Sequence, residues 1–389
     1  MDEIIIIADN GFPISYAATT RVYMLCKLFQ ALNYKTTVFI INVNDKKRFH
    51  LKDENINCRW FPDTRFFAIK YLSENKNVVD AVKKRKNLKY VILYQEILLQ
   101  TLSIIRMAPQ YGFEVIAYFD EWYEWGKNGA ANLMDEFNRS MSIRLSEYIV
   151  APKIKKKIVI SRGLKNFYKK DYCLLLPTLV DISDDIWKRN YSIKNERITI
   201  LYAGWPGNRD DLRMLVETVD QLPKKEKERI LLRIFTYRTT KEELKKHIPD
   251  LERIEKDNCG IIEFCGEVTR EEVIKELKKA DFSYLLRENK WSNNAGLSTK
   301  IGESLACGTP MFANCTSDIG YYIKDHYNGI LIEDMSKEAV KNGVYKLLDL
   351  SREECIKMKK NAYETAVKYF DYLQYVKQTK KFLERKLDG

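Results

Sequence analysis

A pattern of strand, loop, helix and strand at the start of the chain constrains its fold more than any other feature. Residues 3–8 form a largely apolar run that predicts a buried strand, and residues 10–13 predict a tight loop. Apolar side chains at helical spacing predict a helix over 16–32, and a second strand is expected over 36–43. Such a βαβ unit joins two parallel strands through a crossover helix. The pattern therefore predicts a parallel sheet covered by helices.

The same pattern starts again after a polar segment, residues 181–197, which predicts a linker because few of its side chains can pack. The chain is therefore expected to hold a domain of residues 1–181, a linker of residues 182–197 and a domain of residues 198–367. Further strands are expected at 90–93, 114–119, 157–160 and 173–176 in the first domain. In the second domain they are expected at 198–203, 229–236, 261–265, 282–286 and 311–313, with a helix over 210–221 after the first of these.

Composition excludes several classes of protein. The 389 residues are 45% hydrophobic and 31% charged, a balance that excludes extensive disorder. The longest apolar runs fall far short of the roughly 20 residues of a membrane helix, and no secretion signal is recognised at the N-terminus, so a cytoplasmic protein is expected. Eight scattered cysteines without a CxxC pair and three histidines predict neither a zinc site nor disulfides.

The net charge of +12 suits nucleic acid, an anionic membrane or phosphorylated ligands, and does not choose among them. The unbalanced basic patches, residues 83–89 and 153–170, are interpreted mainly as solvated helix faces.

The most informative stretch runs from the strand at 282–286 to Pro310. A loop of small residues leads into a short helix that Gly308 and Pro310 end. Free backbone N–H groups at the start of this helix suit a phosphate, and Lys300 adds a positive charge in its first turn. Glu303 could accept hydrogen bonds from ribose hydroxyls. The alternative is a plain Lys300–Glu303 ion pair of roughly 0.2–0.5 kcal/mol.

The sequence from Lys300 to Pro310, KIGESLACGTP, resembles a motif of the retaining glycosyltransferases of family 4. That family has the GT-B fold, an α/β architecture of two facing Rossmann-like domains with an interdomain cleft. The resemblance implies a nucleotide-diphosphate-sugar donor, no divalent metal and no other cofactor. It identifies Glu303 as the second Glu of the Glu-x7-Glu motif, which binds ribose. Ala295 stands where the first Glu would fall, and Asn294 is expected as a polar substitute.

Other segments resemble the family in the expected order. Arg209 matches a basic residue near the donor diphosphate, with a surface ion pair to Asp210 or Asp211 as the alternative. Arg287, at the carboxyl end of a strand, has a guanidinium that suits a diphosphate. The terminal helix, residues 368–387, matches one that crosses back to complete the first domain (368–389). The donor-binding residues implied are Gly11, Tyr16, Gly204, Gly207, Arg287, Asn294, Gly296, Leu297, Ser298, Thr299 and Glu303, with Glu267 and Val268 at the nucleotide base.

Two further sites are expected in the first domain. Many family members place a His after the strand that corresponds to 114–119, and this chain has Asp120 and Glu121 there. Either carboxylate is expected to orient the donor sugar or to accept the acceptor's proton, with a helix N-cap as the alternative for Asp120. Arg162 is expected to contact the acceptor or the diphosphate. Lys300 and Arg209 complete the catalytic set by stabilising the leaving diphosphate.

The sequence therefore predicts a retaining glycosyltransferase of bacterial surface-polysaccharide assembly, of the capsule, O-antigen or exopolysaccharide type. Its partners would be a nucleotide sugar, a glycan or lipid-linked saccharide and the anionic inner face of the membrane, with no nucleic acid. Three alternatives stay open: a sugar-nucleotide 2-epimerase, which the lack of a suitably placed His disfavours, a noncatalytic nucleotide- or glycan-binding protein, and a nucleic-acid-binding protein.

Overall fold

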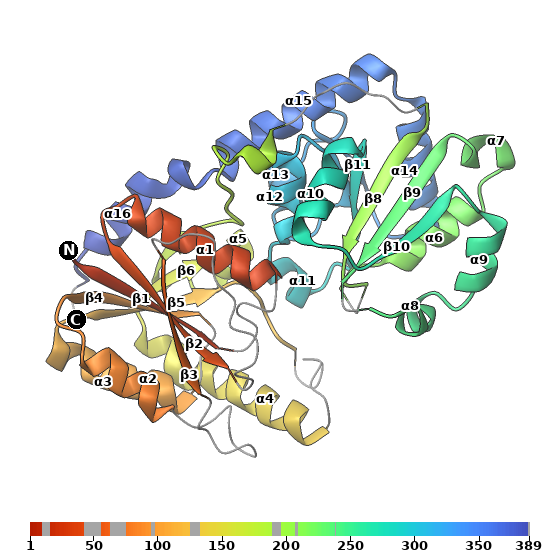
Figure 1. The fold of residues 1–389 in the computed structure, drawn as a ribbon. Coiled ribbons are helices and arrows are strands. Elements are labelled where there is room, and N and C mark those ends of the chain that lie inside the picture. Colours follow the sequence, from red (N-terminus) through yellow and green to blue (C-terminus); the bar gives the residue numbers. More distant parts are fainter. Residues whose placement is uncertain are drawn as a thin grey trace. The chain divides into compact units, whose positions relative to one another are not determined.

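A computed structural model describes residues 1–9, 16–42, 56–62, 75–94, 98–124, 133–188, 196–206, 209–237 and 239–387. The chain forms two compact units (Figure 1). The first comprises Met1–Leu179 together with Tyr372–Gly389, and the second comprises Val180–Asp371.

The first unit is a seven-stranded parallel sheet in the order β3-β2-β1-β4-β5-β6-β7. Its strands are β1 (Glu3–Asp9), β2 (Lys35–Asn42), β3 (Asn57–Pro62), β4 (Leu88–Tyr94), β5 (Glu114–Phe119), β6 (Lys156–Val159) and β7 (Tyr172–Leu175). Its helices are α1 (Tyr16–Gln30), α2 (Lys76–Lys83), α3 (Leu98–Tyr111), α4 (Leu133–Leu145), α5 (Arg162–Phe167) and α16 (Val376–Glu384), with the short turns η2 (Ser146–Val150), η3 (Ala151–Lys153) and η5 (Tyr372–Tyr375).

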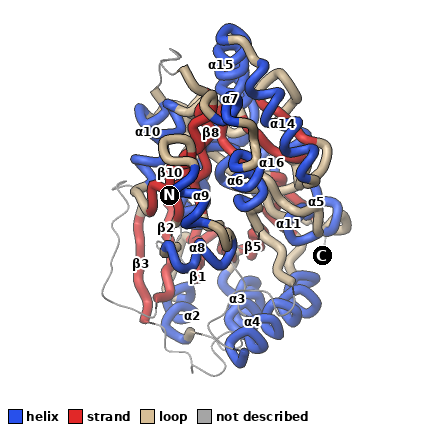
Figure 2. Tube along the Cα trace, turned by 90° about the vertical axis from the view of Figure 1, so that its right-hand side faces the viewer, coloured by secondary structure: helices blue, strands red, loops and turns tan. Residues whose placement is uncertain are grey.

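The second unit is a six-stranded parallel sheet in the order β10-β9-β8-β11-β12-β13. Its strands are β8 (Ile198–Gly204), β9 (Ile230–Thr236), β10 (Ile262–Gly266), β11 (Phe282–Leu285), β12 (Met311–Asn314) and β13 (Gly329–Ile332). Its helices are η4 (Asp185–Trp187), α6 (Leu212–Asp220), α7 (Lys224–Lys227), α8 (Lys241–His247), α9 (Leu251–Asp257), α10 (Arg270–Lys279), α11 (Trp291–Ala295), α12 (Thr299–Ala306), α13 (Ile319–Tyr322), α14 (Lys337–Asp349) and α15 (Arg352–Tyr369). Figure 2 shows the helices in blue and the strands in red along the trace.

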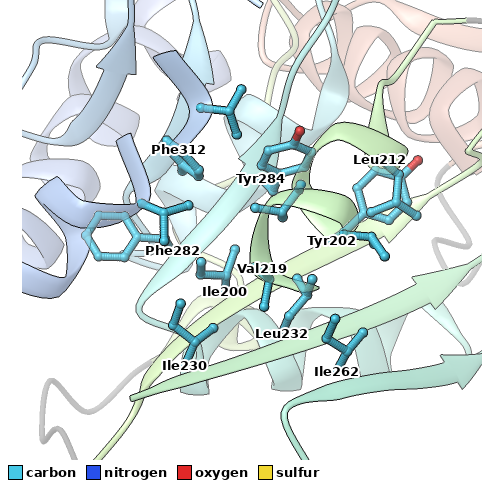
Figure 3. Close-up of a cluster of buried hydrophobic side chains, with 14 of the residues drawn as sticks. Ile200, Tyr202, Leu212, Val219, Ile230, Leu232, Ile262, Phe282, Tyr284 and Phe312 are labelled. Carbon is cyan, nitrogen blue, oxygen red and sulfur yellow. The ribbon is translucent and has the colours of Figure 1, made fainter. Parts of the chain in front are cut away.

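Both sheets are buried on their two faces, as parallel sheets are. In β1, Ile4 and Ile6 pack into one core cluster with α1 and α16, while Ile5 and Ile7 pack into another with α2 and α3. Figure 3 shows a corresponding cluster of the second unit, in which Ile200, Tyr202 and Phe282 meet Leu212 and Val219 of α6. The expected pair of parallel-sheet units is therefore confirmed.

The structure corrects three predictions. The polar segment at 181–197 packs more than expected, because its described part contains η4 and Trp187, which is only 4% exposed. The helix expected over 368–387 is interrupted, since α15 ends at Tyr369 and α16 begins at Val376. The basic patch at 153–170 is not one solvated helix face, because Lys156 and Lys157 are buried in β6.

The sequence prediction also missed two strands, β3 and β13. Gly329, the first residue of β13, packs so closely that a Cβ there would lie 2.5 Å from the carbonyl oxygen of Met311. Asn328 fixes the preceding turn by donating to the carbonyl of Tyr322 (2.9 Å) and to the hydroxyl of Thr365 (2.8 Å). These contacts give the Asn328-Gly329 turn a structural role.

Candidate functional site

The candidate site lies at the carboxyl edge of the second sheet, where the strand order reverses between β8 and β11. Ligands of doubly wound sheets bind outside this edge at the reversal point. Gly204 ends β8, and Arg287 lies two residues beyond β11. Between them, Asp210 forms an isolated antiparallel bridge with Arg287, and the Asp211 N–H donates to the Leu286 carbonyl (2.9 Å). The backbone therefore brings the loop after β8 to the end of β11.

Asp210 is the centre of the site. Its buried carboxylate accepts hydrogen bonds from Arg287 Nε (2.7 Å) and from Lys300 Nζ, and Tyr202 OH donates to it at 3.2 Å. Burial alone would raise the pKa of Asp210, but the charges of Arg287 and Lys300 outweigh it and hold this pKa well below its usual range. Asn314 fixes the backbone of Arg287 through bonds to its N–H (3.1 Å) and its carbonyl (2.8 Å).

Lys300 reaches this carboxylate from the first turn of α12. Its ammonium lies 4.2 Å from the centroid of the Tyr202 ring. A Cβ on Gly204 would lie 2.5 Å from Lys300 Nζ, so the glycine leaves the space that the lysine occupies. Burial lowers the pKa of Lys300, and Asp210 opposes that effect. The Lys300–Glu303 ion pair considered as an alternative is not formed, because each of the two residues has another partner.

The partner of Glu303 is Arg270, the first residue of α10. Arg270 Nε donates to Glu303 Oε1 at 2.8 Å, and Arg270 Nη2 lies 2.8 Å from the same oxygen. The guanidinium also lies over the ring of Trp187, 5.7 Å from its centroid. Both donors use one carboxylate oxygen, and none of the described residues donates to Oε2. Arg270 therefore holds one oxygen of Glu303, and the other accepts from none of the described residues.

The start of α12 has the features expected of an anion site. Ser298 is its N-cap, and the Ser298 side chain makes no capping hydrogen bond. The Ile301 N–H donates to the Ser298 carbonyl (3.2 Å), and the N–H groups ahead of it lack an intrahelical partner, as at any helix start. Gly296, Leu297 and Ser298 are buried, and Thr299 is half-buried.

Asn294 and Ala295 lie in α11 beside this loop. The Asn294 side chain donates to Asn289 Oδ1 (2.7 Å) and accepts from the Ser317 N–H (2.7 Å). Ser317 has φ +53°, so this bond supports a left-handed backbone conformation. Ala295 is fully buried. Sugar contact by Asn294 stays a prediction.

The remaining predicted donor residues are placed as follows. Glu267 is exposed and Val268 is half-buried, directly after Gly266, which ends β10 with φ +73°. Arg209 is half-buried and directly precedes Asp210. Gly11 and Gly207 lie outside the described residues, as does the side chain of Tyr16, whose backbone begins α1.

In the first unit, Asp120 follows the end of β5 and is held tightly. Arg21 Nη1 donates to it at 2.7 Å and Tyr94 OH at 2.6 Å. Burial raises the pKa of Asp120, against the opposing effect of Arg21. Residues 121–124 are not helical, so the N-cap alternative for Asp120 is wrong.

Glu121 and Arg162 are half-buried. Arg162 is the first residue of α5, whose N-cap Ser161 accepts from the Leu164 N–H (3.1 Å). The structure does not test the catalytic or acceptor role of either residue.

Sequence reasoning missed four contributors to the site: Tyr202, Asp210, Arg270 and Trp187. Asp210 was considered only as a surface partner of Arg209. Arg270 lies between Thr269 and Glu272, which form the capping box of α10. Sequence reasoning therefore assigned this segment to helix capping and not to ligand binding. Trp187 was the one available signal, because a tryptophan in a polar segment needs something to pack on.

No group of three or more His, Cys, Asp or Glu side chains among the residues that the structure describes is arranged to hold a metal ion. None of their helices is long and apolar enough to cross a membrane.

Comparisons with known proteins show similarity to glycosyltransferases. Residues 183–365 match the family model "Glycosyl transferases group 1". An uncharacterized glycosyltransferase of Methanocaldococcus jannaschii is 24% identical over 385 residues, which covers 91% of this chain and 90% of that protein.

Solved structures show the same fold over the full length. Sucrose-phosphate synthase from Thermosynechococcus elongatus superposes with a TM-score of 0.73 at 13% identity, covering 98% of each chain. HepE of Anabaena in complex with UDP and glucose superposes with a TM-score of 0.71 at 11% identity, covering 98% of this chain and 99% of that one.

The second unit matches the glycosyl transferases group 1 model over residues 183–365, and the protein is a glycosyltransferase with the GT-B fold.

Proposed function

We propose that this protein is a retaining glycosyltransferase that moves a sugar from a nucleotide-diphosphate sugar to a glycan or a lipid-linked saccharide in the assembly of a bacterial surface polysaccharide. The observation that carries the proposal is the convergence of Lys300 and Arg287 at the carboxyl edge of the second sheet, beside Glu303. Two cations, a helix N-terminus and a carboxylate with one open oxygen suit a diphosphate joined to a ribose.

In this proposal, Lys300, Arg287 and Arg209 stabilise the charge that develops on the leaving diphosphate. Glu303 accepts hydrogen bonds from the ribose, and the turn at Glu267 and Val268 reads the base. Transfer with retention would follow a front-face displacement, in which a donor phosphate oxygen takes the proton of the acceptor hydroxyl. Asp120, fixed by Arg21 and Tyr94, would orient the donor sugar.

The acceptor is proposed to be presented at an anionic membrane surface by the first unit. Several large apolar side chains of α4 and η2 are exposed there, and Lys153 and Lys155 follow them on the surface. Apolar side chains next to lysines suit a lipid interface. The exposed apolar residues are Leu133, Met134, Phe137, Tyr148 and Ile149.

The test is a thermal-shift panel with UDP, ADP, GDP, CDP and dTDP and their glucose conjugates. A ligand at a hundredfold excess over its Kd is expected to stabilise the folded chain by about 2.7 kcal/mol. A specific donor site should be stabilised more by one nucleotide base than by the others. Because HepE was solved with UDP, UDP is the first candidate.

The stabilisation should be lost in Glu303→Ala and Lys300→Ala and kept in Lys337→Ala, a matched control on the exposed face of α14. A chain that responds to none of these nucleotides would contradict the proposed function.

A further inference from the structure

Two cations from different parts of the second unit meet a single carboxylate. Lys300 belongs to α12 and Arg287 to the end of β11, while Asp210 lies in the loop after β8. Their side chains are 18%, 13% and 5% exposed, respectively. No other acidic side chain among the described residues forms an ion pair with either cation.

We propose that Asp210 is a positioning residue of the donor site, an internal counter-ion that holds the Lys300 ammonium at the end of β8 and keeps it charged for the donor diphosphate. This inference rests on the proposed function, because it assigns the diphosphate to Lys300.

The first argument is the cost of burying charge. A cation taken out of water is strongly disfavoured unless an anion and hydrogen bonds compensate it. Lysine responds to burial by losing its proton, whereas arginine does not. Lys300 is therefore the cation whose charge depends on Asp210.

The second argument is that Asp210 cannot turn away. Its backbone is bridged to Arg287, its carboxylate accepts from Tyr202 OH, and the Asp211 N–H is bonded to Leu286. Tyr284 OH adds a bond to the Asp211 carbonyl at 2.7 Å. The carboxylate therefore defines where the Lys300 ammonium lies before any donor arrives, which is the condition for preorganised electrostatic stabilisation.

The third argument is charge balance. Asp210, Lys300 and Arg287 together carry one net positive charge, and the diphosphate of a nucleotide sugar carries two negative charges. The triad thus keeps a net attraction for the diphosphate although the carboxylate is present. Loss of the Lys300 proton would leave Asp210 and Arg287 neutral as a pair and remove that attraction.

The groups that face Lys300 come from three elements. Tyr202 of β8 lies under the ammonium, Asp210 contacts it from the loop after β8, and Arg287 approaches from the end of β11. Glu303, one turn further along α12, is paired with Arg270. Burial and Arg287 hold the pKa of Lys300 below its usual value, although Asp210 raises it. Without Asp210, Lys300 would lose its proton at a lower pH.

The experiment measures the Kd of UDP-glucose from pH 6.5 to 9, a range in which the diphosphate diester does not titrate. The wild-type Kd is expected to change less than about threefold over this range. In Asp210→Asn, the Kd is expected to rise at least tenfold towards pH 9 as Lys300 loses its charge. The slope against pH is the readout, because removal of a negative charge changes the absolute Kd by itself.

Two variants make the result specific. Asp210→Asn combined with Lys300→Arg should restore a flat profile, because arginine keeps its proton at pH 9. Asp281→Asn is the matched control: Asp281 is an equally buried carboxylate, 2.9 Å from Lys359, before the amino end of β11. It should lower stability and leave the profile flat. A flat profile in Asp210→Asn, or a steep one in the double variant, would overturn the inference.

A second measurement uses the wild-type chain alone, in case Asp210→Asn does not fold. Amine labelling read by mass spectrometry compares Lys300 with the exposed Lys224 over the same pH range. Lys300 should stay protected through pH 9, and labelling at the rate of Lys224 would overturn the inference. Failure of the wild-type chain to bind UDP-glucose and the ADP, GDP, CDP and dTDP conjugates would instead contradict the proposed function itself.

Discussion

Arg270 illustrates how one side chain can define the geometry of another. It places two donors on Oε1 of Glu303 and rests against the Trp187 ring. The guanidinium is planar, so two donors aimed at one oxygen fix both the distance and the tilt of the carboxylate. Glu303 raises the pKa of Arg270 against the opposing effect of burial, so the guanidinium stays charged.

Arg270→Gln is therefore expected to weaken UDP binding about tenfold, since a hydrogen bond to a charged group contributes about 1.5–3 kcal/mol. The measurement compares the Kd of UDP with that of 2′-deoxy-UDP, because a ribose contact discriminates between them. In Arg270→Gln, the ratio of the two Kd values should fall to that of Glu303→Ala. In Arg270→Lys, the ratio should recover in part. Arg253→Gln, which breaks an exposed ion pair with Asp220, is the control. Unchanged discrimination in Arg270→Gln would show that Arg270 does not position Glu303.

At the scale of elements, α4 differs from the other helices of the first unit. It begins with Leu133 and Met134, which are 91% and 66% exposed, and Phe137 is exposed one turn later. The helix is followed by η2, which exposes Tyr148 and Ile149. Apolar side chains that no core covers reduce their contact with water when they enter a lipid interface.

We expect the wild-type chain to co-sediment with vesicles that contain phosphatidylglycerol, and more weakly with vesicles of phosphatidylcholine alone. Leu133→Glu combined with Phe137→Glu should reduce binding at least tenfold, because each buried apolar side chain contributes about 1.5–3 kcal/mol. Leu373→Glu, on exposed η5, is the matched control. Equal sedimentation of the double variant and the wild type would exclude α4 as the contact, and Kd values for UDP should not change.

At the scale of the whole molecule, residues 372–389 belong to the same unit as residues 1–179. After α15 ends in the second unit, residues 372–389 return to the first unit, where Phe382 and Leu383 join its core. Tyr90 OH (2.9 Å) and Lys156 Nζ (2.7 Å) donate to the Leu383 carbonyl. The core of the first unit is therefore complete only when Phe382 and Leu383 of α16 have packed into it.

Phe382→Ala is expected to destabilise the first unit by about 3–5 kcal/mol and to leave the second unit intact. Unfolding followed by calorimetry should then show two transitions, because two units with separate cores need not unfold together. UDP should raise the temperature of the transition of the second unit alone. Removal of residues 386–389 is the control, and a single transition shifted as a whole would show that the units unfold cooperatively.

Local sequence was enough to predict most of the strands and helices, because apolar periodicity is a property of neighbouring residues. Parallel strands share a carboxyl edge, so a strand end and the next helix start were enough to place Arg287, Lys300 and Glu303 near one another. Of the two missed strands, β3 (NCRWFP) has Arg59 among its apolar residues and ends in Pro62, and β13 has only four residues. The interrupted terminal helix has apolar residues at helical spacing on both sides of the break, and periodicity alone does not reveal it.

Tertiary structure decided which side chains pair with Arg287, Lys300 and Glu303. Asp210 and Lys300 are 90 residues apart in sequence, and Arg270 and Glu303 are 33 apart. Ion pairs between elements have no periodic signature, since they depend on how helices and loops pack on the sheet. The sequence by itself therefore determined the class of fold and the sheet edge at which Arg287, Lys300 and Glu303 gather. Only the folded chain determined which carboxylate holds Lys300 and which guanidinium holds Glu303, because burial makes an unpaired charge unfavourable and packing selects its partner.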